Sequence, residues 1–525
     1  MAEQGDPVAQ YYLAASYANG KGVTQDFNLA FKWYVLSANQ GLSDAQYDLG
    51  YMYDEGIGVE QSYAEARKWY ELAANQEHPV AQNDLGIMYE YGNGVDIDYV
   101  KAVHWYRLSA SSGYPVAQFN LGLKYQLGLG LSQDYSKAQE LYLLSANQNY
   151  SFAQNEIGYI YEIGEGVNQN HEEALKWYQL AANNGNAIAQ NNLGLMYDNG
   201  QGVQQDYEEA LKWYHIAASQ GSADAQNNIG VMYQFGHGVK QNLTKAIEWF
   251  HLAANGGAAL AQYNLGYLYE NGMGVEKDFV KSFEWYHLAA TQGDGFAIYK
   301  IGTAFQGGIG VERDYKEAMN WYQLAASQEN VEAFVNIGYL YSEGLGVEQN
   351  FTSALEWYRK AAEKNNTQAQ YNLGLMYQYG IGIKQDLPEA VKWYGLAAEE
   401  GMANAQNNLG ILYESGTGVH QDLNTAFKWF LLAAENGNVN AQFNLGLFYE
   451  HGKGVTKNIS QAINWYRIAG EQGDALSLYN LGTLYYKGSG IEQNKHVAKE
   501  LFGRSCDNQF QQGCDSYKNL NKEGY

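Results

Sequence analysis

The chain has 525 residues, and its 57 Asp and Glu residues outnumber its 32 Lys and Arg residues, which gives a formal net charge of −25 at pH 7. Such a surface repels phosphate groups, so nucleic acids and anionic membranes are poor partners. No apolar run in the sequence approaches the roughly 20 residues that a membrane-spanning helix needs, and we expect no direct membrane insertion.

A pair of glycines one residue apart recurs every 36 residues along the chain. The fourteen pairs run from Gly20 and Gly22 to Gly488 and Gly490 without an insertion or a deletion. A fixed period of this length is typical of a solenoid. It takes precedence over the several globular domains that the length alone would suggest.

The period also fixes the expected domain organisation. We expect one continuous domain over residues 1–525, with repeats in phase from 5–40 to 473–508 and a C-terminal cap at 509–525. The first residues of the chain resemble the turn between two repeats at Gly470–Asp474. We therefore expect the chain to begin in the middle of a repeat, after a missing helix, so the absence of a secretory signal says little about its compartment.

Each repeat is expected to fold into two helices, which we name helix A and helix B. In residues 185–220, apolar residues recur at helical spacing on both sides of the Gly-x-Gly pair. The helix A stripe is Ala189, Leu193, Met196 and Tyr197, and the helix B stripe is Tyr207, Ala210, Leu211, Tyr214 and Ala217. A pair of short helices buries too little apolar surface alone, so each repeat must pack on its neighbours.

The expected helix ends carry the residues that such ends favour. Asp206 stands before its helix B, and its side chain can accept bonds from the N–H groups of the first turn. Asp206 with Glu209 also has the spacing of a capping box. The first glycine of each pair suits the left-handed residue that ends a helix, and Gly194 inside helix A permits close helix approach. The four prolines are expected at helix starts: Pro7, Pro79, Pro115 and Pro388.

One repeat shows the family that the chain resembles. The run Ala189-Gln190-x-Asn192-Leu193-Gly194-x-Met196-Tyr197, followed by Gly200-x-Gly202-Val203 and Asp206-Tyr207-x-x-Ala210-x-x-Trp213-Tyr214, resembles the Sel-one-like repeat (SLR), a relative of the tetratricopeptide repeat. The resemblance covers essentially the whole chain. It implies an all-α, right-handed αα superhelical solenoid of about fourteen 36-residue repeats with a C-terminal capping helix.

The resemblance also implies a function. Proteins of this family usually act as non-enzymatic adaptors that bind other proteins, and many bacterial members work in the envelope or at a host interface. The family pattern names structural positions and carries no catalytic residue onto this chain, so we expect no enzyme and no cofactor. His215, His251 and His287 share a column, but no Cys or carboxylate completes a ligand set, and we expect no metal site.

Cys506 and Cys514 are the two cysteines of the chain. Their spacing, at the end of the last helix B and the start of the final helix, resembles the bridged pairs of cysteine-rich SLR proteins. A disulfide would hold the last half-repeat, which has no following neighbour, and would favour an oxidising, extracytoplasmic compartment. Two buried thiols in a reducing cell are the alternative, and the spacing leaves it open.

Three helix A columns are expected opposite the core stripe, on the face that lines the concave side in this family. Drawing the helix at 100° per residue places Asn191, Leu195 and Asp198 there. The columns hold aromatic, bulky and acidic residues respectively, and they vary between repeats. From them we expect a partner to contact Tyr263, Tyr299 and Tyr371, then Tyr267 and Tyr339, then Asp198, Glu270 and Glu414.

The acidic column is a physical anomaly. It lies in the last turn of helix A, where the helix dipole makes each carboxylate unfavourable by about 0.3–1 kcal/mol. We therefore hypothesise that the face binds basic segments through ion pairs and cation–π contacts. The alternative is that the charges serve solubility and that the aromatic residues pack between neighbouring A helices.

A further helix A column and two aberrant repeats add candidate contacts. Asn fills this column in nine of fourteen repeats and could hold a peptide backbone or bond the loop of the neighbouring repeat. Our candidates from it are Asn228, Asn264, Asn336 and Asn372. In the ninth and tenth repeats, Phe334 stands where Gln is usual and Phe296 also departs from its column. These two repeats are either a binding hot spot or a compensated repacking.

Three functions remain in competition at this stage. A scaffold that binds protein or peptide segments on the helix A face is favoured, and basic or aromatic segments suit that face. A weak β-lactam-interacting hydrolase of the cysteine-rich SLR type is the second, although this chain has one Cys pair and no suitable Ser-x-x-Lys. A structural spacer that self-associates through the solenoid ends is the third.

Overall fold

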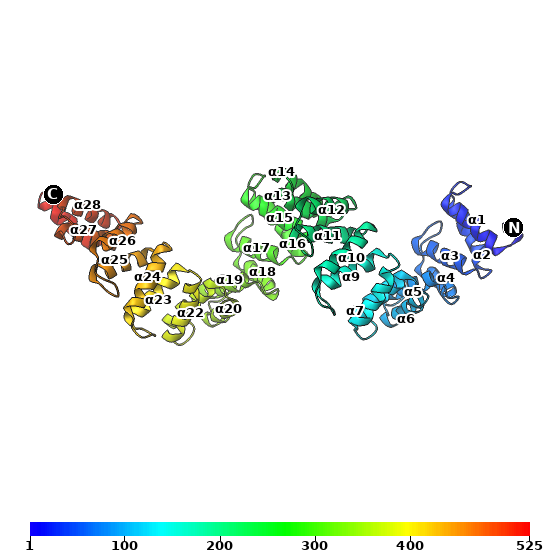
Figure 1. The fold of residues 1–525 in the computed structure, drawn as a ribbon, viewed down its shortest axis with the longest axis horizontal. Helices are drawn as coiled ribbons and strands as arrows, with labels where there is room; N and C mark the ends of the chain where they lie inside the picture. The colour runs from blue at the N-terminus through cyan, green and yellow to red at the C-terminus, as the bar shows by residue number, and fades with distance from the viewer. The chain divides into compact units, whose positions relative to one another are not determined.

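The computed structural model describes residues 1–525 and contains 29 α-helices, one short 3-10 helix at Ala2–Gln4 and no β-strand (Figure 1). Helices A and B alternate along the chain. The A helices are α1 Pro7–Asn19, α3 Ser43–Glu55, α5 Pro79–Tyr91, α7 Pro115–Leu127, α9 Ser151–Ile163, α11 Ala187–Asn199, α13 Ala223–Phe235, α15 Ala259–Asn271, α17 Gly295–Gly307, α19 Val331–Glu343, α21 Thr367–Tyr379, α23 Ala403–Ser415, α25 Val439–His451 and α27 Ala475–Lys487.

The B helices follow them in each repeat. They are α2 Phe27–Ala38, α4 Tyr63–Ala74, α6 Tyr99–Ser111, α8 Tyr135–Ala146, α10 His171–Asn183, α12 Tyr207–Ser219, α14 Leu243–Asn255, α16 Phe279–Thr291, α18 Tyr315–Ser327, α20 Phe351–Glu363, α22 Leu387–Glu399, α24 Leu423–Glu435, α26 Ile459–Glu471 and α28 Lys495–Asp507, and α29 Gln511–Lys522 ends the chain. The predicted all-α repeat fold is confirmed. None of the helices combines the length and the apolarity that a bilayer crossing would require.

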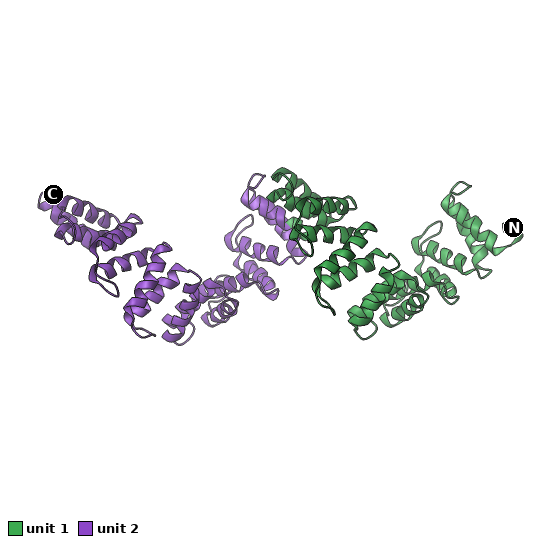
Figure 2. Ribbon diagram, viewed as in Figure 1, with its two compact units in different colours: residues 1–262 green, residues 263–525 purple.

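The chain divides into two compact units, residues 1–262 and 263–525 (Figure 2). Within each unit, the two helices of a repeat pack on one another, and helix B packs on helix A of the repeat that follows, as α12 does on α13. Stability in each unit therefore depends on contacts between neighbouring repeats. The expectation of one continuous domain over residues 1–525 stays a prediction.

The predicted helix ends are confirmed, with one difference. Asp206 Oδ1 accepts from the Glu209 N–H at 3.0 Å, and Gly200 ends α11 with a φ of 69°. The reciprocal bond of a capping box does not form. The Asp206 N–H already donates to the Tyr197 carbonyl of helix A at 2.9 Å, and the Glu209 carboxylate pairs with Lys212 at 2.7 Å. The cap residue thus joins the end of helix A to the start of helix B.

In most repeats, two glycines lie where a neighbouring helix or loop comes too close for a Cβ. A Cβ on Gly194 would lie 2.5 Å from the Tyr214 ring, so this glycine lets helix A meet helix B of its own repeat. A Cβ on Gly202 would lie 2.4 Å from the carbonyl oxygen of His171, which begins helix B of the preceding repeat. The second glycine of the pair therefore seats the A–B loop on the preceding repeat.

A pair of amides, which we call the Gln bridge, links consecutive repeats. Gln190 Nε2 donates to the Ala182 carbonyl of the preceding repeat at 3.1 Å, and Gln220 Nε2 donates to Gln190 Oε1 at 2.6 Å. The same two bonds occur at Gln46 with Gln76, at Gln154 with Asn184, at Gln406 with Asn436 and at Gln442 with Gln472. Each bridge supplies an acceptor and a donor that a buried seam between helices requires.

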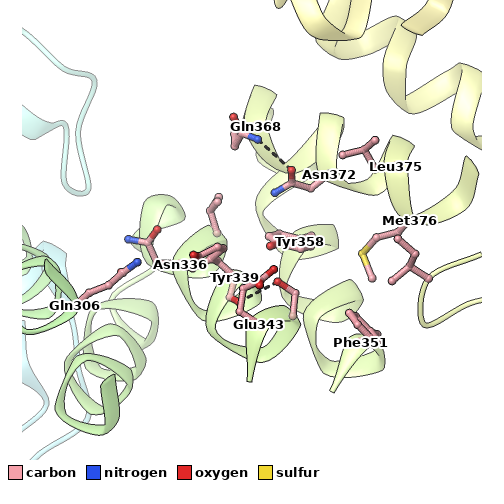
Figure 3. A pocket seen from close by; sticks show the side chains of 13 residues that line it. Gln306, Asn336, Tyr339, Glu343, Phe351, Tyr358, Gln368, Asn372, Leu375 and Met376 are labelled. Atoms are coloured by element: carbon pink, nitrogen blue, oxygen red, sulfur yellow. Dashed lines mark hydrogen bonds between the residues drawn. The ribbon is translucent and has the colours of Figure 1, made fainter. Parts of the chain in front are cut away.

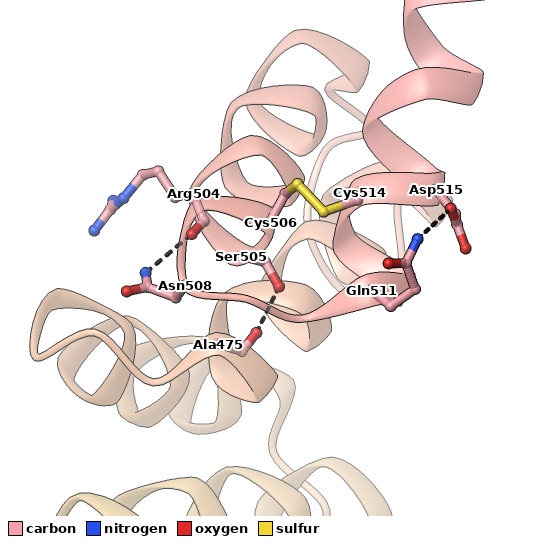
Figure 4. The surroundings of a disulfide bond; sticks show 8 residues. All are labelled: Ala475, Arg504, Ser505, Cys506, Asn508, Gln511, Cys514 and Asp515. Carbon is pink, nitrogen blue, oxygen red and sulfur yellow. Dashed lines mark hydrogen bonds between the residues drawn. A yellow bond between two sulfur atoms is a disulfide. The ribbon is translucent and has the colours of Figure 1, made fainter.

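The end of the chain is held by a covalent link. A disulfide joins Cys506 in α28 to Cys514 in α29, with their Cα atoms 4.5 Å apart (Figure 4). The α29 helix is polar and buries only Gly513 and Leu520. Because so little apolar surface holds this helix, the disulfide is a major part of its attachment.

Candidate functional site

The acidic column of helix A bonds mainly inside its own repeat. The Tyr214 hydroxyl donates to Asp198 Oδ2 at 3.2 Å, and the Tyr286 hydroxyl donates to Glu270 Oε2 at 2.7 Å. The same bond forms in four further repeats: Tyr70 to Asp54, Tyr106 to Glu90, Tyr178 to Glu162 and Tyr466 to Glu450. A buried phenol hydroxyl needs a hydrogen-bond acceptor, and the carboxylate supplies it. This bond explains why these repeats keep a carboxylate in the last turn of helix A, although the helix dipole disfavours it there.

Glu414 differs because Phe430 replaces the tyrosine of its repeat. Its carboxylate pairs instead with Lys453 Nζ of the next repeat at 2.9 Å. Burial raises the pKa of Asp198, and its bond with Tyr214 partly offsets this effect. The carboxylates Asp198, Glu270 and Glu414 therefore all have internal partners, and a basic ligand would have to compete with those partners.

The tyrosines of the aromatic column pack against helix B of their own repeat. The Tyr263 ring centroid lies 5.4 Å from that of Tyr286 in a tilted arrangement, and Tyr299 and Tyr371 pack in the same way against Tyr322 and Tyr394, each at 5.8 Å. The prediction that this column lies opposite the core is wrong for its Asn members, since Asn191 is only 8 % exposed, whereas Tyr263, Tyr299 and Tyr371 are half-buried. Helix A of the next repeat covers this flank, which a wheel drawn for one helix does not include.

The Asn column links neighbouring A helices. Asn228 Nδ2 donates to Asn191 Oδ1 of the preceding repeat at 3.0 Å, and Asn336 Nδ2 donates to the Tyr299 hydroxyl at 3.3 Å. Asn372 Oδ1 accepts from Gln368 Nε2 in its own helix at 3.0 Å. Asn264 occupies the equivalent position in α15. The alternative that these amides bond within the protein is therefore observed, and the bond goes to a helix rather than to a loop.

The bulky column is the one that faces solvent. Tyr339 is 41 % exposed, Tyr51 is 44 % exposed, and Tyr267 is similarly exposed. Phe296, beside Tyr263 at a ring distance of 6.0 Å, is exposed as well. Among the predicted contacts, these side chains offer a partner the most apolar surface.

A groove of about 540 Å³ lies among α17, α19, α20 and α21, and we call it the repeat 10 groove after the repeat at its centre, residues 329–364. It brings together three predicted contacts, Asn336, Tyr339 and Asn372. Figure 3 places Tyr339 and Glu343 between Asn336 on one side and Asn372 with Leu375 on the other.

The other predicted contacts lie outside this groove. Tyr263, Tyr267, Glu270 and Phe296 belong to α15 and α17, while Asn228 and Asp198 belong to the unit of residues 1–262. Phe334 lies in α19 but is 4 % exposed and packs on Trp357 at a ring distance of 5.7 Å. The sequence marked Phe334 as aberrant, and the structure gives it a packing role.

The lining of the groove combines apolar and amide side chains. Val335, Tyr339, Leu375 and Met376 form the apolar part. The amides are Gln306, Asn336, Gln368 and Asn372, and Glu343 stands exposed beside them. The sequence did not predict Gln306, Glu343 and Gln368 as contacts. Its one indication was that they lie near predicted residues, on the same A helix or on a neighbouring one. No group of three or more His, Cys, Asp or Glu side chains gathers as a metal ion would require.

Comparisons with known proteins identify the repeat. The Sel1 repeat model matches fourteen consecutive segments, from residues 7–42 to residues 475–510. Among solved structures, c5321, a protective antigen present in uropathogenic Escherichia coli strains that displays an SLR fold, is 31 % identical, with a TM-score of 0.58 over 94 % of this chain and 97 % of that chain.

A Sel1 repeat protein from Oxalobacter formigenes is also 31 % identical, with a TM-score of 0.44 over 57 % of this chain and 87 % of that chain. No curated protein sequence matches this chain.

Proposed function

The chain belongs to the Sel1 repeat family, whose solenoids commonly serve as non-enzymatic scaffolds for protein interactions, and we propose that it binds extended polypeptide segments in the repeat 10 groove. The observation that carries the proposal is the lining of this groove. An exposed tyrosine and an apolar wall stand beside four amide side chains, all within one hollow of about 540 Å³.

The amides suit a polypeptide backbone. A peptide that leaves water must find partners for its N–H and C=O groups, because each unpaired group costs about 1–3 kcal/mol. Asn and Gln side chains offer both donors and acceptors. Gln306, Asn336, Gln368 and Asn372 each make a hydrogen bond inside the protein. Their remaining donors and acceptors can pair with an extended segment without dictating its side chains.

The apolar part of the groove suits one anchoring side chain. Burying a large apolar or aromatic side chain contributes about 1.5–3 kcal/mol. Tyr339 and Leu375 face the groove from α19 and α21, so an anchor between them contacts two repeats at once (Figure 3). We place the anchor there and the backbone along the amides.

The negative charge of the chain indicates which class of polypeptide segment the groove favours. The chain carries a formal net charge of −25, and the exposed Glu343 lies at this groove. A segment that bears Lys or Arg next to its apolar anchor is attracted at long range and can pair with Glu343. Salt screens such attraction, so binding should weaken as ionic strength rises.

The test starts from a displayed library of random peptides that is selected on the full chain. Affinities of the selected peptides are then measured for the wild-type protein, for Tyr339→Ala and for Tyr51→Ala. Tyr51 belongs to the same column and is equally exposed, but it does not line the groove.

We expect Tyr339→Ala to weaken binding about tenfold or more and Tyr51→Ala to leave it unchanged. Selected peptides should contain an apolar residue beside a basic one. Equal losses for both variants, or peptides whose binding is insensitive to salt and to Tyr339, would contradict the proposal.

A further inference from the structure

A second hollow opens where the Gln bridge is missing. At least five of the fourteen repeats close the seam between successive B helices with both bonds of this pair of amides. In repeat 10, Phe334 replaces the first amide and Lys364 replaces the second. The bridge cannot form here, because Phe334 offers neither a donor for the carbonyl of the preceding repeat nor an acceptor for the residue at position 364.

The hollow measures about 480 Å³ and lies between α18 and α20. Phe334 forms its base and Trp357 one wall, with Gln323 and Ser327 contributed by α18. It shares no lining residue with the repeat 10 groove. An occupant of this hollow would therefore bind independently of the peptide proposed above.

Two lysines border the aromatic part of the hollow. Lys360 stands where the repeats on either side have Leu324 and Leu396, and its Nζ lies 4.1 Å from the Trp357 ring centroid. Lys364 Nζ pairs with Glu329 Oε2 at 2.7 Å. The hollow of a chain with a net charge of −25 thus contains two ammonium groups beside an aromatic wall.

The Glu329 carboxylate is the anion that pairs with Lys364 in this structure. The Glu329 side chain is largely exposed to water. The bond with Lys364, followed by the charges of Lys364 and Lys360, lowers the pKa of the Glu329 carboxyl. A carboxylate on an exposed side chain therefore already pairs with Lys364, while Lys360 lines the same hollow, and this carboxylate can leave into water at small cost.

We propose that this hollow binds an acidic polypeptide segment in which a carboxylate adjoins a large apolar side chain. The incoming carboxylate replaces that of Glu329 beside Lys360 and Lys364, and the apolar side chain packs against Trp357 above Phe334. Glu363 also lines the hollow, so its two ammonium groups already face two carboxylates, and the incoming carboxylate has to displace that of Glu329 from Lys364.

The experiment measures fluorescence anisotropy of a labelled, blocked peptide, Gly-Asp-Phe-Asp-Gly, titrated with the full chain. Matched peptides carry Asn or Lys in place of Asp. The protein variants are Lys364→Gln, which restores the residue type of Gln220, and Lys360→Leu, which restores that of Leu396. Glu329→Gln removes the internal competitor. Lys392→Gln is the control, because Lys392 is an exposed lysine paired with Glu389 outside the hollow.

We expect the acidic peptide to bind about tenfold more tightly than the Asn peptide, and the Lys peptide not to bind the hollow. Lys364→Gln and Lys360→Leu should each weaken the acidic peptide about fivefold, while Glu329→Gln should tighten it about threefold. Lys392→Gln should change nothing.

Lys364→Gln should weaken binding of the acidic peptide and Glu329→Gln should strengthen it, although both variants break the same ion pair. A purely structural role of this ion pair would give both variants an effect of the same sign. No binding of the acidic peptide at millimolar concentration, equal binding of the acidic and Asn peptides, or weaker binding by Glu329→Gln would each overturn the proposal. These outcomes do not depend on Tyr339, so they are separate from the test of the repeat 10 groove.

Discussion

Asp84 offers the sharpest test of how the repeats are held together. It occupies the Asn column, in which nine of fourteen repeats have Asn. Burial raises the pKa of the Asp84 carboxyl to about 6, bonds with Asn83 and Tyr47 lower it again in part, and the charge of Asp54 adds to the rise. Asp84→Asn keeps the acceptor oxygen and the shape but removes the charge.

The sign of the effect follows from proton binding. Because the folded state holds the Asp84 proton more tightly than the unfolded state, this carboxyl adds stability at low pH that is lost as the pH rises from about 4 to about 6. A shift of about two units from the ordinary value corresponds to about 2–3 kcal/mol. Asp84→Asn should therefore match the wild type near pH 4 and exceed its stability by about 2 kcal/mol at pH 7.

The assay is amide hydrogen exchange of α5 and α6 between pH 4 and pH 7, because a repeat protein opens locally and a single melting curve would average over all repeats. Asn120→Asp, in the same column of the next repeat, is the reverse control. It loses the bond from Asn120 Nδ2 to Asn83 Oδ1 and should acquire the pH dependence that Asp84→Asn loses. An identical pH profile for Asp84→Asn and the wild type would refute the reasoning.

Two further changes test other contacts of the fold. Tyr178→Phe leaves the Glu162 carboxylate without its phenol donor and should destabilise repeat 5 by about 1 kcal/mol, whereas restoring neutrality with Glu162→Gln in the same chain should recover part of the loss, as measured by exchange of α9 and α10. Reduction of the Cys506–Cys514 disulfide should lower the stability of α29 by about 2–3 kcal/mol and speed its exchange while the repeats before α27 stay unchanged; loss of protection throughout the chain would contradict a local role.

The elements of the fold followed from local signals in the sequence. The apolar stripe around Leu193 places helix A, Asp206 caps helix B, and Gly200 ends helix A, and each signal acts within a few residues. The structure agrees with all of them. The capping box failed because its backbone donor is taken by Tyr197, a partner in the other helix.

The surface was harder to predict because it depends on neighbours in space. A helix wheel places Asn191 opposite the core, yet helix A of the next repeat covers it through Asn228. The Tyr214–Asp198 bond joins residues sixteen positions apart across a loop, which no local pattern indicates. The repeat 10 groove likewise needs side chains from several helices, so only Asn336, Tyr339 and Asn372 were anticipated.

The most direct test of polypeptide binding in the repeat 10 groove is site-specific photo-crosslinking. A benzophenone side chain is placed at Tyr339 in one protein and at Tyr51 in another, and each is irradiated with a selected peptide. A crosslink at position 339 and none at position 51 is the result we predict, whereas equal crosslinking at both positions, or crosslinking at position 51 alone, would contradict the account.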